Sequence, residues 1–230
     1  MATLVSPVNL LTKKEYFNQW QSATWEDYLY CADSKELEDV KLYFYNNQLL
    51  IQMSTEGIDH SSICNLFIIL FYIWFSQNPE QNYTSCGGCL LENQELKMAF
   101  APDLVLYLGD NNLKRKEGER RYLDVSKSGI PNLVGEISDT TLPNDLDKKK
   151  HLYASLQIPE YWVVDVQGRR VFCFHLDANN IYQEADFSLT LHNLPISLLN
   201  ETLSLLDSQT NGSVASWFAQ QIQGFNNNNS

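Results

Sequence analysis

Residues Pro131–Asp165 read PNLVGEISDTTLPNDLDKKKHLYASLQIPEYWVVD. This stretch predicts a strand, a polar loop, a helix and a second strand, because two apolar runs enclose a segment with helical spacing. Glu136 is the one acidic residue within the first apolar run, and a buried charged carboxylate is costly unless it is paired, protonated or bound to a metal. A second acid, Asp103, opens another apolar run, APDLVLYLG. Two acids at the edges of buried strands, followed by a lysine-bearing helix, indicate a metal-dependent phosphodiesterase site.

Alternation along the strand and spacing along the helix place several polar side chains together. In LVGEIS, Glu136 and Ser138 lie on the same face of the strand. Asp145, Lys149 and Tyr153 follow one another at intervals of four and share one helical face. The same patterns also fit an edge strand that faces water and an ordinary surface ion pair with Tyr153 packed beneath it.

The chemistry of phosphodiester cleavage explains why these residue types matter. A divalent cation neutralises the phosphate and activates water, and magnesium and manganese prefer oxygen ligands. Asp103 and Glu136 could supply carboxylates, and the backbone carbonyl of Ile137 could add a third oxygen. Lys149 could orient the water or stabilise developing charge. We therefore expect magnesium or manganese as the cofactor.

Composition favours one large folded domain in a reducing compartment. The chain has 230 residues, 44% of them hydrophobic and 12% aromatic, which is ample for a packed core. Its five cysteines form no regular framework, and the N-terminus lacks the pattern of a signal peptide. The longest apolar run, Ile63–Phe75, is shorter than the about 20 residues that cross a bilayer. We therefore expect a cytoplasmic protein with no membrane partner and read this run as a buried helix.

The charge balance limits the kind of nucleic-acid surface the chain can have. A formal net charge of -12 counts against a broad binding surface, whose usual footprint is basic. It leaves room for a local basic groove, and a metal site needs acidic ligands in any case. The densest basic patches are Lys114–Lys116 with Arg120–Arg121, and Lys148–Lys150. A solvated loop or helix face is the simpler interpretation of both.

The order of predicted elements indicates an α/β sandwich around a mixed sheet. Residues 1–24 form an expected arm that packs or pairs with a neighbour, 25–208 the folded domain, and 209–230 a frayed tail. Before the acidic strand we expect a helix over 25–32, a hairpin of 41–44 and 49–53 around Asn46-Asn47, and a helix over 58–75. We also expect a strand over 83–92, interrupted by a bulge or turn at Gly87-Gly88, and a strand over 103–108. From there we expect a strand over 132–138, a helix over 142–156, strands over 161–166, 171–176, 181–185 and 189–191, and a helix over 196–206.

The motifs taken in order resemble one known family. The sequence has Pro102-Asp103, then PNLVGEIS, then Asp145-x3-Lys149-x3-Tyr153, then IPEYWVVD, with a histidine at the start of the long apolar helix upstream. This order is similar to that of the Uma-two family of proposed endonucleases, in the restriction-endonuclease-like PD-(D/E)xK superfamily. The resemblance covers about residues 25–176. It implies a restriction-endonuclease-like α/β core, with a mixed central β-sheet flanked by helices.

Residue by residue, the resemblance implies that Asp103 and Glu136 are metal ligands and that Lys149 is catalytic or contacts phosphate. The superfamily motif places a lysine two residues after the acid, where this chain has Ser138. The resemblance therefore implies that the lysine has moved to the following helix. The histidine upstream, His60, would contact substrate or the second shell of the metal, although a lone histidine also serves as a cap or packing residue.

Two functions from different classes follow. The first is a metal-dependent endonuclease that hydrolyses DNA phosphodiester bonds. The second is a nuclease fold with weak or no catalysis that serves as a DNA-binding or assembly module, which the net charge and Ser138 favour. RNA or a small nucleotide stays open as the substrate. A homodimer is expected by analogy, since nucleases of this superfamily often pair to cut two strands.

Overall fold

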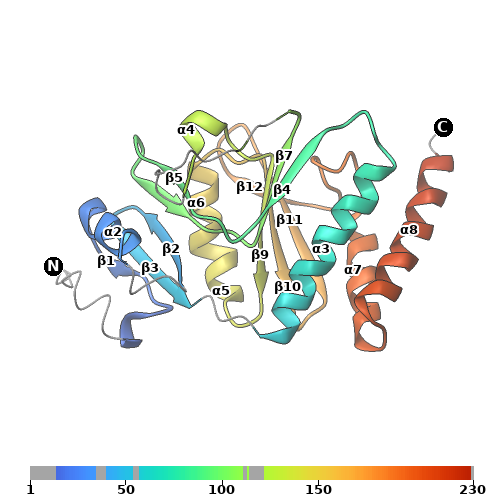
Figure 1. Cartoon of the computed structure of the whole chain (residues 1–230), viewed down its shortest axis with the longest axis horizontal. Coiled ribbons are helices and arrows are strands. Elements are labelled where there is room, and N and C mark those ends of the chain that lie inside the picture. Colours follow the sequence, from blue (N-terminus) through green and yellow to red (C-terminus); the bar gives the residue numbers. More distant parts are fainter. Residues whose placement is uncertain (1–13, 35–39, 54–56, 111–112, 114–121, 229–230) are drawn as a thin grey trace. The chain divides into compact units, whose positions relative to one another are not determined.

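The computed structural model describes residues 14–34, 40–53, 57–110, 113 and 122–228. The chain divides into two compact units. Unit 1 comprises Met1–Glu56, Gly87–Pro102 and Asn112–Gly129, and unit 2 comprises Gly57–Cys86, Asp103–Asn111 and Ile130–Ser230. Each unit contains one six-stranded sheet (Figure 1).

Unit 1 is built on a sheet with the strand order β1-β3-β2-β6-β5-β8. Its central hairpin turns at Asn46 and Asn47, whose φ angles of 50° and 55° suit a tight two-residue turn. Strand β1 comes from the predicted N-terminal arm and pairs with β3 of the same chain. The elements of unit 1 are η1 Lys14–Tyr16, β1 Gln21–Ser22, α2 Trp25–Ala32, β2 Val40–Tyr45, β3 Gln48–Met53, β5 Leu91–Asn93, β6 Met98–Phe100, β8 Leu123–Asp124 and α4 Val125–Ser128.

Unit 2 holds the stretch that decides the fold. Its sheet has the order β12-β11-β10-β9-β7-β4, in which β9 and β10 are parallel and the other neighbours are antiparallel. The predicted mixed sheet is therefore confirmed. Its elements are α3 Ile58–Ser76, β4 Tyr83–Cys86, β7 Leu104–Leu108, β9 Leu133–Ser138, α5 Leu142–Asn144, the π-helix η3 Asp145–Lys149, α6 Lys150–Ser155, β10 Glu160–Asp165, β11 Arg170–Leu176, β12 Tyr182–Ala185, α7 Ile196–Ser204, η4 Leu205–Asp207 and α8 Asn211–Asn228.

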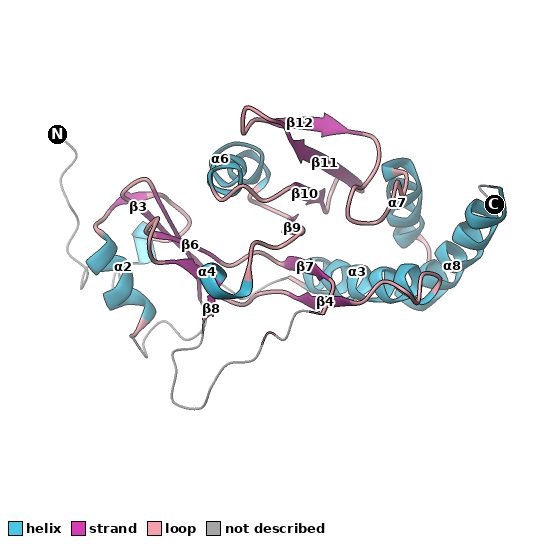
Figure 2. Cartoon of the chain, turned by 90° about the horizontal axis from the view of Figure 1, so that it is seen from above, coloured by secondary structure: helices cyan, strands magenta, loops and turns pink. Residues whose placement is uncertain are grey.

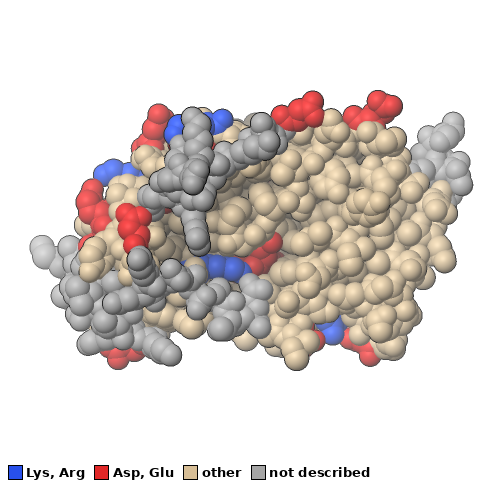
Figure 3. Space-filling model, in the orientation of Figure 1, with Lys and Arg blue, Asp and Glu red and all other residues tan. Residues whose placement is uncertain are grey.

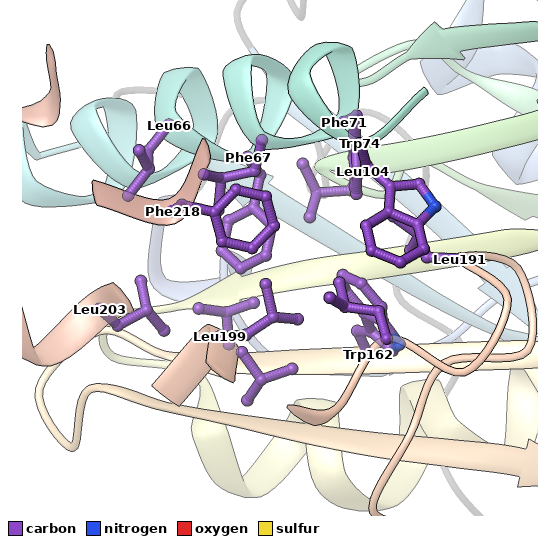
Figure 4. Packing of buried hydrophobic residues seen from close by; sticks show 14 of the residues in the cluster. Leu66, Phe67, Phe71, Trp74, Leu104, Trp162, Leu191, Leu199, Leu203 and Phe218 are labelled. Carbon is purple, nitrogen blue, oxygen red and sulfur yellow. The ribbon is translucent and has the colours of Figure 1, made fainter. Parts of the chain in front are cut away.

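The two faces of this sheet have different covers. Helix α6 lies on one face, and α3, α7 and α8 lie on the other (Figure 2). The second face forms the main hydrophobic core, where side chains of α3 and α8 pack over the strands around Trp162 (Figure 4). Gly135 belongs to this core face. A Cβ atom at Gly135 would lie 3.1 Å from Leu104 Cδ1, so glycine leaves room for the side chain of Leu104 on the neighbouring strand.

Helix α3 is long and apolar enough, by length and composition alone, to span a membrane. In the structure its buried side chains, among them Leu66, Phe67 and Trp74, pack within the core of unit 2. The surface over α3 and α8 carries few charged side chains (Figure 3). The helix expected over this run is therefore present but buried along one face only, since Ile68 and Tyr72 are exposed on the other, and the absence of a membrane partner stays a prediction.

Four sequence predictions need correction or fall outside the described residues. The strand expected over 83–92 is two strands, β4 and β5, which belong to different sheets because the chain leaves the first sheet at Gly87-Gly88. Most of the segment expected as a frayed tail over 209–230 is helical: residues 211–228 form α8, whose Val214, Phe218 and Ile222 are fully buried. Residues 189–191 form a turn and not a strand, since the backbone bonds of this segment close within residues 188–194. The basic patch at 114–121 lies outside the described residues.

Candidate active site

Strand register brings the two predicted acids to the same place on the sheet of unit 2. Leu104 pairs with Gly135 in the antiparallel register of β7 and β9, so Asp103 lies opposite Glu136 one step further on. Residues opposite one another on antiparallel strands share a face and have Cβ atoms about 5 Å apart. A hydrogen bond of 2.8 Å from the Ile137 backbone N–H to Asp103 Oδ2 fixes the aspartate against β9. Glu136 is only 2% exposed.

The helix after β9 carries the predicted lysine to Glu136. Lys149 Nζ lies 3.0 Å from Glu136 Oε2 and 3.0 Å from Asp145 Oδ1. All three side chains are at most 2% exposed, which rules out the surface ion pair that spacing alone allowed. The segment Asp145–Lys149 is a single π-helical turn, a wider winding that often occurs at functional sites.

Hydroxyl groups complete this buried cluster. The Tyr153 hydroxyl donates to Glu136 Oε1, so Tyr153 binds the acid as well as packing the helix on the sheet. The Thr141 hydroxyl donates to Asp145 Oδ2 at 2.6 Å, and Ser138 Oγ lies 3.4 Å from Thr141 Oγ1. Ser138 is buried. Thr141 was missed in the sequence, although it precedes Asp145 by four residues.

Burial and neighbouring charges shift the pKa values of Glu136 and Lys149, the two residues of the central ion pair. Burial raises the pKa of Glu136 to about 7; Lys149 opposes this rise, whereas the Asp103 and Asp145 carboxylates add to it. Burial alone would lower the pKa of Lys149, but the Glu136 and Asp145 carboxylates outweigh it and raise that pKa. Lys149 is therefore an ammonium ion at neutral pH.

His60 joins the site from the start of α3. Its Nε2 lies 3.2 Å from Asp103 Oδ2, and the side chain of Asp103 is 4% exposed. On the other side of the ring, His60 Nδ1 lies 3.5 Å from the Sγ atom of Cys64. His60 therefore contacts Asp103, one of the two predicted metal ligands, directly.

The residues present fit a divalent cation. Within the described part of unit 2, the Lys149 ammonium group contacts two buried carboxylates, those of Glu136 and Asp145, and a third carboxylate, that of Asp103, acts on it electrostatically. The ionised cluster therefore carries excess negative charge, which is expensive in a buried place. Carboxylate oxygens on two adjacent strands are also the donor type that magnesium and manganese prefer.

Comparison with known proteins identifies the family and the fold. The sequence pattern of the family described as "Uma2: Putative restriction endonuclease" matches residues 25–208. The chain belongs to the Uma2 family. A crystal structure of a protein described as a "putative nuclease belonging to DUF820", from Anabaena variabilis, has the same fold. It superposes with a TM-score of 0.51 at 15% identity, over 78% of this chain and 98% of that one. Among curated proteins none matches.

The chain thus belongs to a family described as restriction endonucleases, and its fold has a restriction-endonuclease-like core. The structure gathers every side chain named as a site candidate from the sequence: Asp103, Glu136, Lys149, Ser138, Asp145, His60 and Tyr153. Their catalytic and metal-binding roles stay predictions, as does the Ile137 carbonyl as a ligand. Cys64 was missed, although the spacing His-x3-Cys on an apolar helix was a readable signal.

Proposed function

We propose that this Uma2 protein is a metal-dependent endonuclease that hydrolyses DNA phosphodiester bonds. One observation carries the proposal: Asp103, Glu136 and Lys149, which are far apart in the sequence, converge in one buried cluster of unit 2. Membership of a family described as restriction endonucleases supports DNA as the substrate.

The roles of the residues follow from their charges and positions. Asp103 and Glu136 would hold magnesium or manganese, with the Ile137 carbonyl as an additional oxygen ligand. When bound, such an ion neutralises phosphate charge and makes water a stronger nucleophile. Lys149 keeps its proton, so it serves as a positive group for the phosphate and not as the base that activates water. Asp145 orients Lys149 through their ion pair, and the Thr141 hydroxyl holds Asp145 in place by a hydrogen bond.

A second function has a specific observation in its favour. Both oxygens of Glu136 already accept hydrogen bonds, one from Tyr153 and one from Lys149. A ligand must share Glu136 with these donors or displace one of them. The same closed arrangement suits a nuclease fold that binds DNA or assembles without cutting. A homodimer and a cytoplasmic location belong to either proposal.

Nicking of supercoiled plasmid DNA with magnesium or manganese tests the proposed activity. We expect activity in the wild-type chain and a loss of at least about 100-fold in Asp103→Ala and Glu136→Ala. Asp147→Asn is the matched control, because Asp147 lies in the same helical turn as Lys149 with its side chain 71% exposed. Equal nicking by all four proteins would show that the activity does not come from this site.

A further inference from the structure

One face of α3 carries a second set of metal-ligand side chains, which the endonuclease proposal does not use. His60 and Cys64 are separated by one helical turn and therefore point to the same side of the helix. His60 Nδ1 lies 3.5 Å from Cys64 Sγ, and His60 Nε2 lies 3.2 Å from Asp103 Oδ2. The imidazole thus stands between a thiol and a carboxylate.

The spacing of the three donors is close to that of a metal centre. One ring nitrogen of His60, the Cys64 sulfur and a carboxylate oxygen of Asp103 all lie within 4.8 Å of one another. Ligands of a tetrahedral zinc ion at 2.0–2.3 Å are about 3.3–3.8 Å apart. A movement of the side chains by about 1 Å would therefore bring the three donors onto one ion.

Cys64 is more exposed than Cys31 and Cys173. Cys64 is partly exposed and lies at the edge of the core of unit 2. Cys31 and Cys173 are buried, and burial raises the pKa of each thiol, so both stay protonated. Cys86 and Cys89 are also partly exposed and are the competitors that an experiment has to control.

We propose that Cys64, His60 and Asp103 bind a divalent cation of the zinc class, with water as the remaining ligand. Thiolate and imidazole favour zinc, cobalt or cadmium over magnesium, which prefers oxygen alone. On binding, the sulfur–hydrogen bond of Cys64 breaks, its proton passes to solvent, and the sulfur keeps the electron pair that it donates to the ion. No oxidation or reduction takes place.

Asp103 links this zinc-class site to the proposed endonuclease site. The same carboxylate would serve the oxygen-ligand ion beside Glu136 and the softer ion beside Cys64. A zinc-class ion and magnesium therefore compete for Asp103, and this consequence rests on the proposed function. The binding of the zinc-class ion itself does not, because it needs no catalysis.

Titration of the metal-free, full-length chain with cobalt tests the site. A cobalt–thiolate bond produces a charge-transfer absorption band in the near ultraviolet, and we expect this band to saturate at one cobalt per chain. Cys64→Ser should abolish the band, whereas the double variant Cys86→Ser/Cys89→Ser should retain it. An unchanged band in Cys64→Ser, its loss in the double variant, or no band in the wild-type chain would overturn the proposal.

Calorimetry with zinc gives a second measurement that does not depend on a thiolate band. We expect His60→Gln and Cys64→Ser each to weaken zinc binding by at least about tenfold. Circular dichroism shows whether each variant is folded, and Cys64→Ala replaces any serine variant that is not. Cys64-dependent binding in a chain that does not nick DNA would support this site and count against the endonuclease. Equal zinc affinity in folded wild-type, His60→Gln and Cys64→Ser proteins would exclude the site.

Discussion

Glu136 and Glu160 are two buried glutamates on neighbouring strands of one sheet. They lie on opposite faces of that sheet and have different hydrogen-bond partners. Glu136 lies on β9 and Glu160 on β10, and neither is more than 2% exposed. Glu136 faces α6 and is bound by Lys149 and Tyr153. Glu160 belongs to the opposite face, since it lies two residues before Trp162 of the main core.

Neutral donors satisfy Glu160. Its oxygens accept hydrogen bonds of 2.7 Å from Trp162 Nε1 and of 2.7 Å from the Thr190 backbone N–H, and the Cys173 thiol lies at 3.5 Å. Cys173 and His175 lie near enough to suggest a metal site. However, Glu160 is already engaged by these donors, and His175 Nε2 lies 2.8 Å from the Phe187 carbonyl oxygen. Glu160 therefore holds the 188–194 turn onto the sheet.

The comparison shows that burial alone does not identify a functional acid. Glu160 has its donors supplied by the fold, so it needs no ligand. Among the described residues, Glu136 and Asp145 share the Lys149 ammonium group, and the Asp103 carboxylate opposite Glu136 adds negative charge to the same cluster. A cation from solution would offset that charge. The following predictions separate the two glutamates, from the largest expected effect to the smallest.

Replacing Lys149 by methionine should have the largest effect on stability. The change leaves Glu136 and Asp145 buried without their shared cation, and breaking a buried ion pair in this way costs about 3–5 kcal/mol. Urea unfolding of the metal-free protein measures it. Asp147→Asn, on the exposed side of the same turn, should change stability by less than about 0.5 kcal/mol. If Lys149→Met were as stable as the control, the cluster would not depend on its lysine.

Glu136 should also make stability depend on pH. Its pKa is raised from 4.5 to about 7, so the folded chain binds this proton more tightly than the unfolded chain. The resulting stabilisation is complete below pH 4.5 and is lost as the pH rises to about 7. Between pH 5 and pH 8 the wild-type chain should therefore lose about 2 kcal/mol relative to Glu136→Gln. Urea unfolding at both pH values, with chelator present, checks this; an equal difference at the two pH values would contradict it.

Glu160→Gln should lower stability by about 1–3 kcal/mol, since one carboxylate oxygen becomes an amide that faces the N–H of Thr190 or Trp162. Thermal unfolding measures this loss. Metal binding and nicking should persist in the folded variant, which is the opposite of what we expect for Glu136→Gln. If Glu160→Gln were as stable as the wild-type chain, these hydrogen bonds would not be what holds the 188–194 turn.

Local patterns predicted much of this architecture. Asn46-Asn47 marked the hairpin, and alternation in LVGEIS placed Glu136 and Ser138 on one face of β9. The cost of an acid within an apolar run drew attention to Glu136, and the order of motifs added Asp103 and Lys149; the cost alone does not separate Glu136 from Glu160.

Other features depend on long-range packing, which local patterns do not show. The sequence around Lys149 gives no sign that the helix would widen into a π-turn. Leu189–Leu191 has strand-like alternation, but Glu160 and the Ser188 hydroxyl bind its backbone N–H groups in place of a neighbouring strand. In α8, the spacing of Val214, Phe218 and Ile222 was helical, and the polar end of the chain concealed it.

Calorimetric titration with manganese tests the difference between the two glutamates most directly. The wild-type chain, Glu136→Gln and Glu160→Gln are titrated under the same conditions, after circular dichroism has shown that each is folded. Our account predicts manganese binding to the wild-type and Glu160→Gln chains and none to Glu136→Gln. Equal binding by Glu136→Gln, or no binding by the folded wild-type chain at millimolar manganese, would contradict the claim that Glu136 belongs to a metal site.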